Sequence, residues 1–428
     1  MKFQVKNNSK YKKLLQNEKT QERARMHSFH RYYGKLIPAI PSCFIKEFTK
    51  ANDLVFDPFT GSGTTAVEAM RHGRNFVGYE VNPLSQKIAE IKTRNLNVDT
   101  LLRFNKEIIS IIKNTPITVL PNEIPYVFNR NHWFKEEVQL DLVKIRKAVD
   151  IFFDEDSIKC LENSDQYKDF YLTTVSAILK NVSNADTRHV FPGISKRMRK
   201  LEAEGKINND VFSSFERGIK KRALFYNIYN GSNSSRIILG DSANANMSEL
   251  EEQVDLIVTN PPYISSVRYV ETLKLEMYWM EEIRSVSEYS ELAHKMLGND
   301  RLKKSEYQDL EYTNYDIINA VIDDMSMKDK KSAKIIGEFF NLMEKVIVNM
   351  HVVLKKKGKV VIKISDSKIK KTKIETGKLM TLIAENHGFA LVDLFLDEIN
   401  NNSRSLTTSR NSYSDIITHD YIIIWEKK

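Results

Sequence analysis

Apolar runs and amphipathic stretches alternate along the first hundred residues of the chain. Two short apolar runs, at 54–56 and 76–79, have the length of buried strands. Residues 37–50, 64–71 and 83–92 instead repeat apolar positions at helical spacing. A strand, a glycine-rich turn, a helix and a second strand therefore follow one another, which predicts half of a doubly wound α/β sheet.

The pattern changes after residue 100. Residues 101–232 consist of long amphipathic stretches with scarcely any strand signal, whereas apolar runs resume at 236–239 and 254–258. Residues 264–353 are again rich in helical periodicity. The remaining expected elements are a strand at 359–364, a helix at 374–386 and strands at 390–396 and 420–425.

These elements predict one α/β domain interrupted by helical insertions. The core comprises residues 27–100 and 233–428 and follows a polar, Lys-rich N-terminal arm at residues 1–26. The first insertion spans residues 101–232, and the second spans residues 264–333 within the core. No internal repeat or low-complexity linker divides the chain further.

The composition allows a large packed core. Of the 428 residues, 41% are hydrophobic and 10% aromatic, which excludes global disorder. No window reaches the roughly 18 consecutive apolar residues that a membrane helix needs, and the charged start lacks the apolar stretch of a secretory signal. Only two cysteines are present and the nine histidines show no metal-ligand spacing, so neither a disulfide scaffold nor a metal site is predicted. We therefore expect a cytoplasmic protein.

Positive charge adds a candidate partner. The chain carries 65 Lys and Arg against 56 Asp and Glu, a net charge of +9. Such an excess fits nucleic-acid binding, but also an ordinary solvated surface. Basic runs lie at 195–200, 220–222 and 368–373, and for each run phosphate binding and solvation both remain open.

Glycine is scarce, with 15 residues in the chain, yet Gly61, Gly63, Gly73 and Gly78 fall within 18 positions. The first two belong to a turn that follows Asp57 at the end of a strand and leads into a helix. Such a turn leaves backbone N–H groups free and lets a ligand approach the backbone closely. It has neither the Gly-Lys-Ser/Thr ending of a phosphate-binding loop nor the spacing of a dinucleotide-binding loop.

Glu80 indicates which ligand this turn could hold. It stands 80 − 57 = 23 residues after Asp57, at the end of the next apolar run. A carboxylate in this place can accept hydrogen bonds from the two hydroxyls of a ribose. The turn and the acid together predict a ligand that carries a ribose but no pyrophosphate.

A second polar motif, Asn260-Pro261-Pro262-Tyr263, follows an apolar strand and is therefore expected at the carboxyl edge of the sheet. Its two prolines fix the backbone and remove two N–H donors, which leaves carbonyl oxygens as acceptors. The side-chain oxygen of Asn260 adds another acceptor, and Tyr263 offers a flat face to a planar ring. The motif is suited to holding an exocyclic amine on a stacked heterocycle.

Together these motifs resemble a known family. DPFTGSGTT at 57–65, YEVNP with Glu80, GDS with Asp241 and NPPY at 260–263 are similar to segments of the S-adenosylmethionine-dependent amino-methylating DNA methyltransferases. Those enzymes modify N6 of adenine or N4 of cytosine. The resemblance implies an α/β fold of the class I methyltransferase type, with a Rossmann-like seven-stranded sheet that ends in an antiparallel hairpin.

The resemblance also implies roles for individual residues. Glu80 would hold the ribose hydroxyls of S-adenosylmethionine, and Asp241 would meet its adenine amino group. The segment at 30–38, which includes Lys35, resembles the part of the family that closes over the cofactor's carboxylate. The complete set of implied cofactor-binding residues is Lys35, Asp57, Pro58, Phe59, Gly61, Ser62, Gly63, Thr64, Glu80 and Asp241.

The implied chemistry agrees with the acceptor groups of the second motif. A target base turned out of duplex DNA would donate hydrogen bonds from its amino group to Asn260 and to the carbonyl of Pro261. Pro262 and Tyr263 complete the implied catalytic set. Positioning and electrostatics would supply most of the catalysis, so neither a metal nor a cysteine nucleophile is required. Methylation at C5 of cytosine is disfavoured, because neither cysteine lies in the Pro-Cys motif that this reaction needs.

Several alternatives remain open. Asn before Pro-Pro-Tyr resembles adenine-N6 enzymes, so adenine N6 is the predicted target and cytosine N4 the alternative. An RNA base methylase and a non-catalytic nucleic-acid-binding protein on the same core are further alternatives. The expected partner is double-stranded DNA, and a restriction-modification role would add a cognate restriction endonuclease. The expected location is the bacterial cytosol or nucleoid.

Target recognition is expected in the helical insertions. A long helical segment separates Glu80 from Asp241, which is an unusual place for an insertion in this family. Residues 101–232 are therefore the candidate target-recognition region, with 264–333 as the alternative. Within the first insertion the predicted DNA-binding residues are Lys196, Arg197, Arg199 and Lys200.

Overall fold

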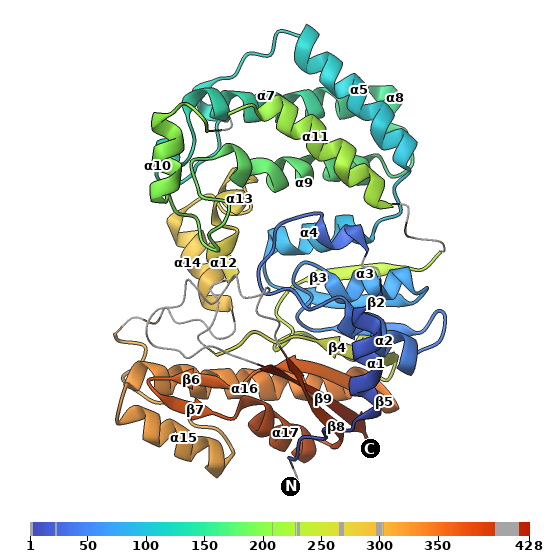
Figure 1. The fold of residues 1–428 in the computed structure, drawn as a ribbon, viewed down its shortest axis with the longest axis vertical. Coiled ribbons are helices and arrows are strands. Elements are labelled where there is room, and N and C mark those ends of the chain that lie inside the picture. Colours follow the sequence, from blue (N-terminus) through green and yellow to red (C-terminus); the bar gives the residue numbers. More distant parts are fainter. Residues whose placement is uncertain are drawn as a thin grey trace.

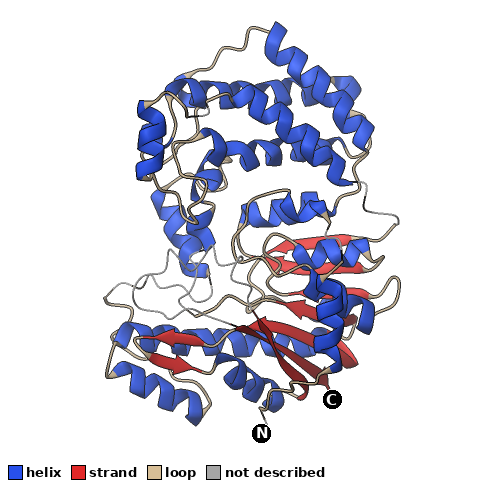
Figure 2. Cartoon of the chain, in the orientation of Figure 1, coloured by secondary structure: helices blue, strands red, loops and turns tan. Residues whose placement is uncertain are grey.

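The computed structural model describes residues 3–21, 24–207, 209–226, 228, 232–264, 269–296, 302, 304–398 and 419–428. Within this part of the chain, a seven-stranded sheet lies at the centre of one lobe, and a second lobe consists of helices (Figure 1; Figure 2). The strands are ordered β3-β2-β1-β4-β5-β9-β8. Their bounds are β1 (Leu54–Asp57), β2 (Asn75–Glu80), β3 (Ser235–Leu239), β4 (Val254–Thr259), β5 (Leu354–Ile364), β8 (Phe389–Glu398) and β9 (His419–Lys427).

The sheet is parallel from β3 to β5 and changes direction at its end. β1 pairs in parallel with β2 and β4, β2 with β3, and β4 with β5. β9 lies between β5 and β8 and is antiparallel to both. The predicted fold class is confirmed, including the antiparallel hairpin at the end of the chain.

Helices cover both faces of the sheet. One apolar cluster joins α1–α3 to Val258 of β4 and Ile422 of β9, and another joins α15–α17 to Ile257 and Ile423. Successive strand residues therefore point to opposite faces, as the two-residue period of a strand requires. The helices of this lobe are α1 (Lys10–Lys19), α2 (Ala39–Phe48), α3 (Thr64–Arg71), α4 (Pro83–Thr93), α15 (Asp316–Ser326), α16 (Lys330–Val353) and α17 (Thr376–Asn386).

The first insertion forms the helical lobe around an apolar cluster that also includes Val67 of α3 and Ile88 of α4. Leu275 and Trp279 of the second insertion are buried in the same cluster, whereas Ile318 and Ile322 of α15 are buried in the cluster below the sheet. The second insertion is thus divided between the two lobes. The helices of the upper lobe are α5 (Val98–Asn114), α6 (Arg130–Trp133), α7 (Glu136–Asp154), α8 (Asp156–Lys159), α9 (Ser164–Val182), α10 (Lys196–Ala203), α11 (Val211–Ala223), α12 (Tyr269–Thr272), α13 (Lys274–Trp279) and α14 (Val286–Lys295).

A small antiparallel hairpin lies between β5 and α17. It consists of β6 (Ser367–Ile369) and β7 (Thr372–Ile374), which the sequence pattern did not predict. The helix expected from residue 374 begins at Thr376 instead, because Ile374 is a strand residue and is fully buried.

No helix among the described residues is long and apolar enough to cross a membrane. The described residues also contain no group of three or more His, Cys, Asp and Glu side chains that could hold a metal ion. Cys43 is buried and Cys160 is exposed, and both are free thiols.

Candidate functional site

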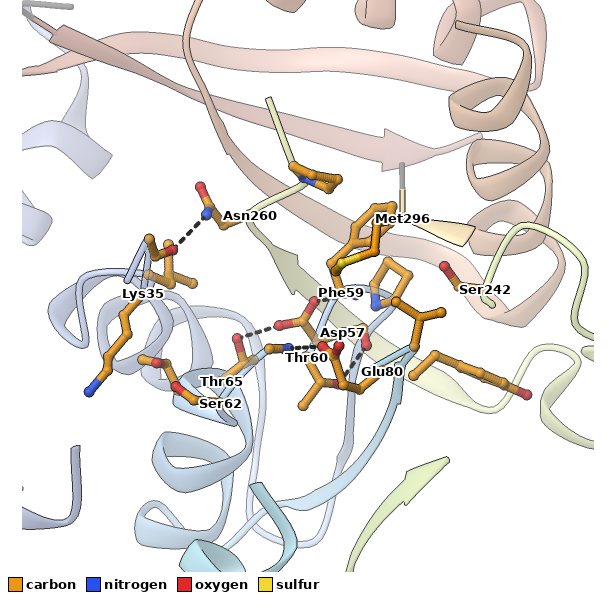
Figure 3. A pocket seen from close by; sticks show the side chains of 18 of the residues that line it. Lys35, Asp57, Phe59, Thr60, Ser62, Thr65, Glu80, Ser242, Asn260 and Met296 are labelled. Atoms are coloured by element: carbon orange, nitrogen blue, oxygen red, sulfur yellow. Dashed lines mark hydrogen bonds between the residues drawn. The ribbon is translucent and has the colours of Figure 1, made fainter. Parts of the chain in front are cut away.

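A pocket opens at the carboxyl ends of β1, β2 and β4. This is the edge at which doubly wound sheets bind ligands. Figure 3 shows Asn260 toward one end of the pocket, near Lys35, and Glu80 and Ser242 toward the other. The lining residues are Tyr32, Gly34, Lys35, Leu36, Asp57, Pro58, Phe59, Thr60, Gly61, Ser62, Thr64, Thr65, Tyr79, Glu80, Val81, Gly240, Asp241, Ser242, Asn260, Pro262, Lys295 and Met296.

Asp57 joins three elements beneath the pocket. Its carboxylate accepts hydrogen bonds from Thr259 Oγ1 of β4 at 2.6 Å, from Thr65 Oγ1 of α3 at 2.8 Å and from the backbone N–H of Phe59 at 3.0 Å. Burial raises the pKa of this carboxyl to about 6, although the three donors lower it. Asp57 therefore fixes the turn between β1 and α3, and its oxygens are already occupied by the protein.

Glu80 is buried at the end of β2 and also holds the turn. Its two oxygens accept the backbone N–H groups of Asn82 and Gly61, each at 2.8 Å. Burial raises the pKa of Glu80 to about 7, the two backbone donors lower it, and the neighbouring Asp57 raises it further. Because a carboxylate has about four lone-pair positions, Glu80 retains acceptor capacity toward the pocket.

Two glycines explain the close packing of this turn. Gly63 has a φ of +77° at the start of α3, and a Cβ there would lie 2.8 Å from the Cβ of Ala89. At Gly78 a Cβ would lie 2.1 Å from Thr60 Oγ1. The glycines thus let α4 and β2 approach the turn, so Gly63 contacts neighbouring helix atoms and does not line the pocket.

Lys35 lies in the segment of residues 27–36, which borders the pocket and which we call the border segment. Its Nζ donates to the carbonyl of His27 at 2.7 Å and to that of His30 at 3.0 Å, and burial lowers its pKa to about 8. Lys35 thereby holds the border segment in a bend. The same segment meets the core through His27, whose Nε2 lies 2.6 Å from Oε1 of the buried Glu68 on α3.

The border segment also contacts the helical lobe. Arg31 donates to the carbonyl of Thr187 at 2.5 Å, and Tyr33 donates to the carbonyl of His189 at 2.9 Å. His30 is buried with Nε2 3.1 Å from Ser176 Oγ of α9. One wall of the pocket is therefore attached to the first insertion.

Asn260 presents its amide at the pocket edge. Its Nδ2 lies 3.4 Å from the carbonyl of Gly34, and its Oδ1 lies 3.4 Å from the hydroxyl of Tyr263. Pro262 lines the pocket beside Asn260, whereas Pro261 and Tyr263 lie outside the lining. The border segment thus orients the amide so that its oxygen faces away from Gly34.

A polar cluster holds the hydroxyl of Tyr263. Lys363 Nζ of β5 donates to this hydroxyl at 3.0 Å, and Asp420 Oδ1 of β9 lies 3.1 Å from it. Lys363 and Asp420 also form a buried ion pair of 2.6 Å, and Ser365 donates to Asp420. Because the carboxylate is both nearer and a stronger acceptor than Asn260, it accepts the main hydrogen bond of the phenol O–H, and the contact of that hydroxyl with the Asn260 oxygen is the weaker one.

Asp241 shapes the far end of the pocket. Its carboxylate accepts the backbone N–H of Ala243 at 2.9 Å and Nδ2 of Asn244 at 2.6 Å, which closes the turn after β3. Ser62 lines the pocket nearer to Lys35 (Figure 3), and its Oγ is buried without a hydrogen-bond partner among the described residues.

Most of the predicted cofactor-binding residues therefore meet in one pocket, and the predicted DNA-binding residues lie elsewhere. Lys196, Arg197, Arg199 and Lys200 are exposed on α10 in the helical lobe, where Arg197 pairs with Asp186 at 3.0 Å. The sequence analysis missed Lys295 and Met296 at the end of α14, because no local pattern predicts that this helix borders the pocket. It also missed Lys363 and Asp420, although each lies next to a run of apolar strand residues, and a charge in that place was the available signal.

A comparison with protein-family models identifies the family of this chain. A family model described as DNA methylase, of the N6/N4 type, matches residues 2–91 and 254–428. Type II methyltransferase M.MvaI from Kocuria varians is 28% identical over 80% of this chain and 76% of its own. Type II methyltransferase M.BsoBI from Geobacillus stearothermophilus is 22% identical over 94% of this chain and 86% of its own. Among solved structures, a TehB-like SAM-dependent methyltransferase from Corynebacterium glutamicum aligns with 97% of this chain and 98% of its own, at 8% identity and a TM-score of 0.31.

Proposed function

The chain belongs to the N6/N4 DNA methylase family, and from that premise we propose that it transfers the methyl group of S-adenosylmethionine to an exocyclic amino group of a DNA base. One observation carries this proposal. The pocket combines a ribose-type carboxylate, Glu80, with the amide of Asn260 at a different end. One cavity can therefore hold both the cofactor and the amino group that receives the methyl group.

The residues at the Glu80 end are suited to S-adenosylmethionine. When bound, this cofactor supplies a methyl group on a positively charged sulfur. Glu80 would accept the ribose hydroxyls, and Asp241 would accept the adenine amino group. Ser62 Oγ would donate to the carboxylate of the cofactor, which satisfies a buried atom that has no partner among the described residues.

Asn260 would act on the target base. Its Oδ1 and the carbonyl of Pro261 would accept the two N–H groups of the amine, which draws the nitrogen lone pair out of conjugation with the ring. The ion pair of Lys363 and Asp420 would keep the phenol proton of Tyr263 away from Asn260. Positioning of the amine by these acceptors is then the main catalytic contribution of the protein.

The base itself is the finer part of the proposal. Adenine N6 and cytosine N4 are both amino groups conjugated to a ring nitrogen, and Asn260 can accept hydrogen bonds from either. The Asn-Pro-Pro-Tyr tetrapeptide favours adenine N6, so we propose adenine and keep cytosine as the alternative. The biological role that we propose is DNA modification within a restriction-modification system, with a cognate endonuclease as partner.

The test separates cofactor binding from methyl transfer. Asn260→Ala leaves every hydrogen bond of Glu80 and Asp57 in place, so the affinity for S-adenosylmethionine should change by less than about twofold in calorimetry. Removing one transition-state acceptor should lower kcat by about 100-fold or more in a tritiated-methyl assay. Full turnover by this variant would contradict the assigned role.

A graded variant tests the supporting ion pair in the same assay. Asp420→Asn offers a weaker acceptor to Tyr263, so the phenol proton turns partly toward Asn260. We expect kcat to fall by about tenfold while the cofactor affinity is retained. An unchanged kcat would show that the Asn260 oxygen does not depend on Asp420.

A further inference from the structure

The hairpin of β6 and β7 carries an unusual concentration of positive charge. It follows β5 directly and contains Lys368, Lys370, Lys371 and Lys373, with Asp366 at its base. Lys370 and Lys371 form the two-residue turn and are both exposed. The tip of the hairpin is therefore cationic.

The backbone of this turn is one that lysine seldom adopts. The φ angles are +48° at Lys370 and +68° at Lys371, so both turn residues are left-handed. A two-residue hairpin turn with this geometry is of type I′, for which Asn-Gly is the preferred pair. The two lysines thus stand where side chains with a Cβ destabilise the turn, and backbone strain of this kind concentrates at functional positions.

Neighbouring groups hold the hairpin in one place. Lys373 pairs with Asp366 at 3.0 Å, and Tyr421 of β9 donates to the same carboxylate at 3.2 Å. At the first residue of β7, Thr372 Oγ1 accepts a hydrogen bond of 2.8 Å from Lys328. Lys328 also pairs with Asp324 of α15 at 2.6 Å. The strand residues on both sides of the turn are therefore attached to the core.

The hairpin begins close to the proposed catalytic cluster. Lys363 and Ser365, which contact Tyr263 and Asp420, precede the first residue of β6 by four and two positions. Three residues of strand extend roughly 10 Å, so the tip lies roughly that far from the start of the hairpin. Figure 1 shows the hairpin and α10 on the same side of the molecule, one in each lobe.

We propose that Lys370 and Lys371 bind the phosphate backbone of DNA beside the methylated base. This inference rests on the proposed function and adds a DNA contact in the core that is separate from the helical insertion. Lysine is suited to phosphate as a compact charge, and a contact of this kind positions the duplex without selecting its sequence. Phosphate binding by these two charges would account for the lysines in a turn that otherwise favours Asn-Gly.

The test replaces the pair by the residues that the turn prefers. Lys370→Asn with Lys371→Gly removes two charges and relieves two left-handed lysines, so the melting temperature should rise by roughly 1–3 °C. Affinity for a short fluorescent duplex of arbitrary sequence should fall on the order of tenfold at 0.1 M salt. The slope of log K against log salt should become shallower by about 1.8, or about 0.9 for each lost phosphate contact.

A matched control lies in the first half of β5, away from the carboxyl end of the strand that leads into the hairpin. Lys357 has a φ of +64° and stands beside exposed Lys356 in the first half of β5. Lys356→Gln with Lys357→Asn also removes two charges and relieves a left-handed lysine, and it should leave the DNA affinity and the salt slope unchanged. Calorimetry with S-adenosylmethionine checks that both variants keep the pocket.

The outcomes are distinguishable. An unchanged DNA affinity in the hairpin variant overturns the inference. An equal loss of DNA affinity in the control variant also overturns it. The same holds if the hairpin variant loses affinity for an RNA duplex but not for the DNA duplex. If the variant is less stable, Lys370→Gln with Lys371→Gln, which keeps the backbone, must show the same loss of DNA affinity, or the inference fails. A wild-type chain that binds the cofactor but no DNA would instead overturn the proposed function.

Discussion

At the scale of single residues, the carboxyl of Glu80 does two things at once. It accepts two backbone N–H groups that fix the turn after β1, and it faces the pocket where ribose hydroxyls would donate to it. Burial raises its pKa to about 7. Accepting hydrogen bonds from the ribose hydroxyls requires the ionised form of Glu80, because a protonated carboxyl offers fewer acceptor positions.

Cofactor affinity should therefore depend on pH around neutrality. Above pH 7 Glu80 is ionised and the affinity for S-adenosylmethionine is constant; below pH 7 the proton competes with the ribose, and the affinity should fall by about tenfold for each pH unit. Calorimetric titrations between pH 6 and 8 measure this. In Glu80→Gln the affinity should be low and independent of pH over that range. A wild-type affinity that does not change with pH would show that Glu80 is not the ribose acceptor.

The sequence predicts those site residues that follow directly from strands. Asp57, Glu80 and Asn260 each come immediately after an apolar run, and parallel strands bring such ends together at one edge. Met296 and Asp420 could not be assigned in this way, since their positions depend on how α14 and β9 pack. The sequence also gives no sign that the carboxylate of Asp57 accepts hydrogen bonds from Thr259 and Thr65.

At the scale of elements, α10 carries the residues that we propose for DNA binding in the helical lobe. Its first turn contains no acidic residue, and basic side chains stand where the helix dipole is already positive. This arrangement is unfavourable for an isolated helix and favourable beside a phosphate. Ser195 caps the helix and donates to Asp186 at 2.6 Å, which ties its start to the loop that meets the border segment.

The pairing of Arg197 with Asp186 divides the basic run into two classes. Lys196→Gln with Arg199→Gln should make the salt slope of DNA binding shallower by about 1.8, because both charges are exposed. Arg197→Gln should change the slope less, since its guanidinium is held by Asp186, a carboxylate that it shares with Arg188. Anisotropy titrations at several salt concentrations measure both slopes. Equal slopes for all variants and the wild type would exclude α10 from the DNA interface.

The elements themselves were predictable to different degrees. The helix at 64–71 has the same bounds in the structure, because a glycine stands at each end of a strong helical pattern. The β6–β7 hairpin was not predicted, since three-residue strands rich in lysine give no periodic signal and its turn lacks Asn and Gly. The sequence also could not show that the second insertion divides between two clusters.

At the scale of the whole molecule, the border segment connects the two lobes at the pocket. His27 attaches it to Glu68 of the core, Lys35 holds its bend from within, and Arg31 attaches it to the loop after α9. The helical lobe is thus in contact with a wall of the proposed cofactor pocket. Through these contacts, the target recognition that we propose for the insertion would be linked to methyl transfer in the core.

The most direct test of methyl transfer to an amino group is mass spectrometry of nucleosides. Unmethylated genomic DNA is incubated with the protein and S-adenosylmethionine that carries a deuterated methyl group, and is then digested to nucleosides. The account predicts labelled N6-methyladenine, with labelled N4-methylcytosine as the alternative base, and no label above background with Asn260→Ala. Label on C5 of cytosine, label in RNA alone, or no label from a chain that binds the cofactor would contradict it.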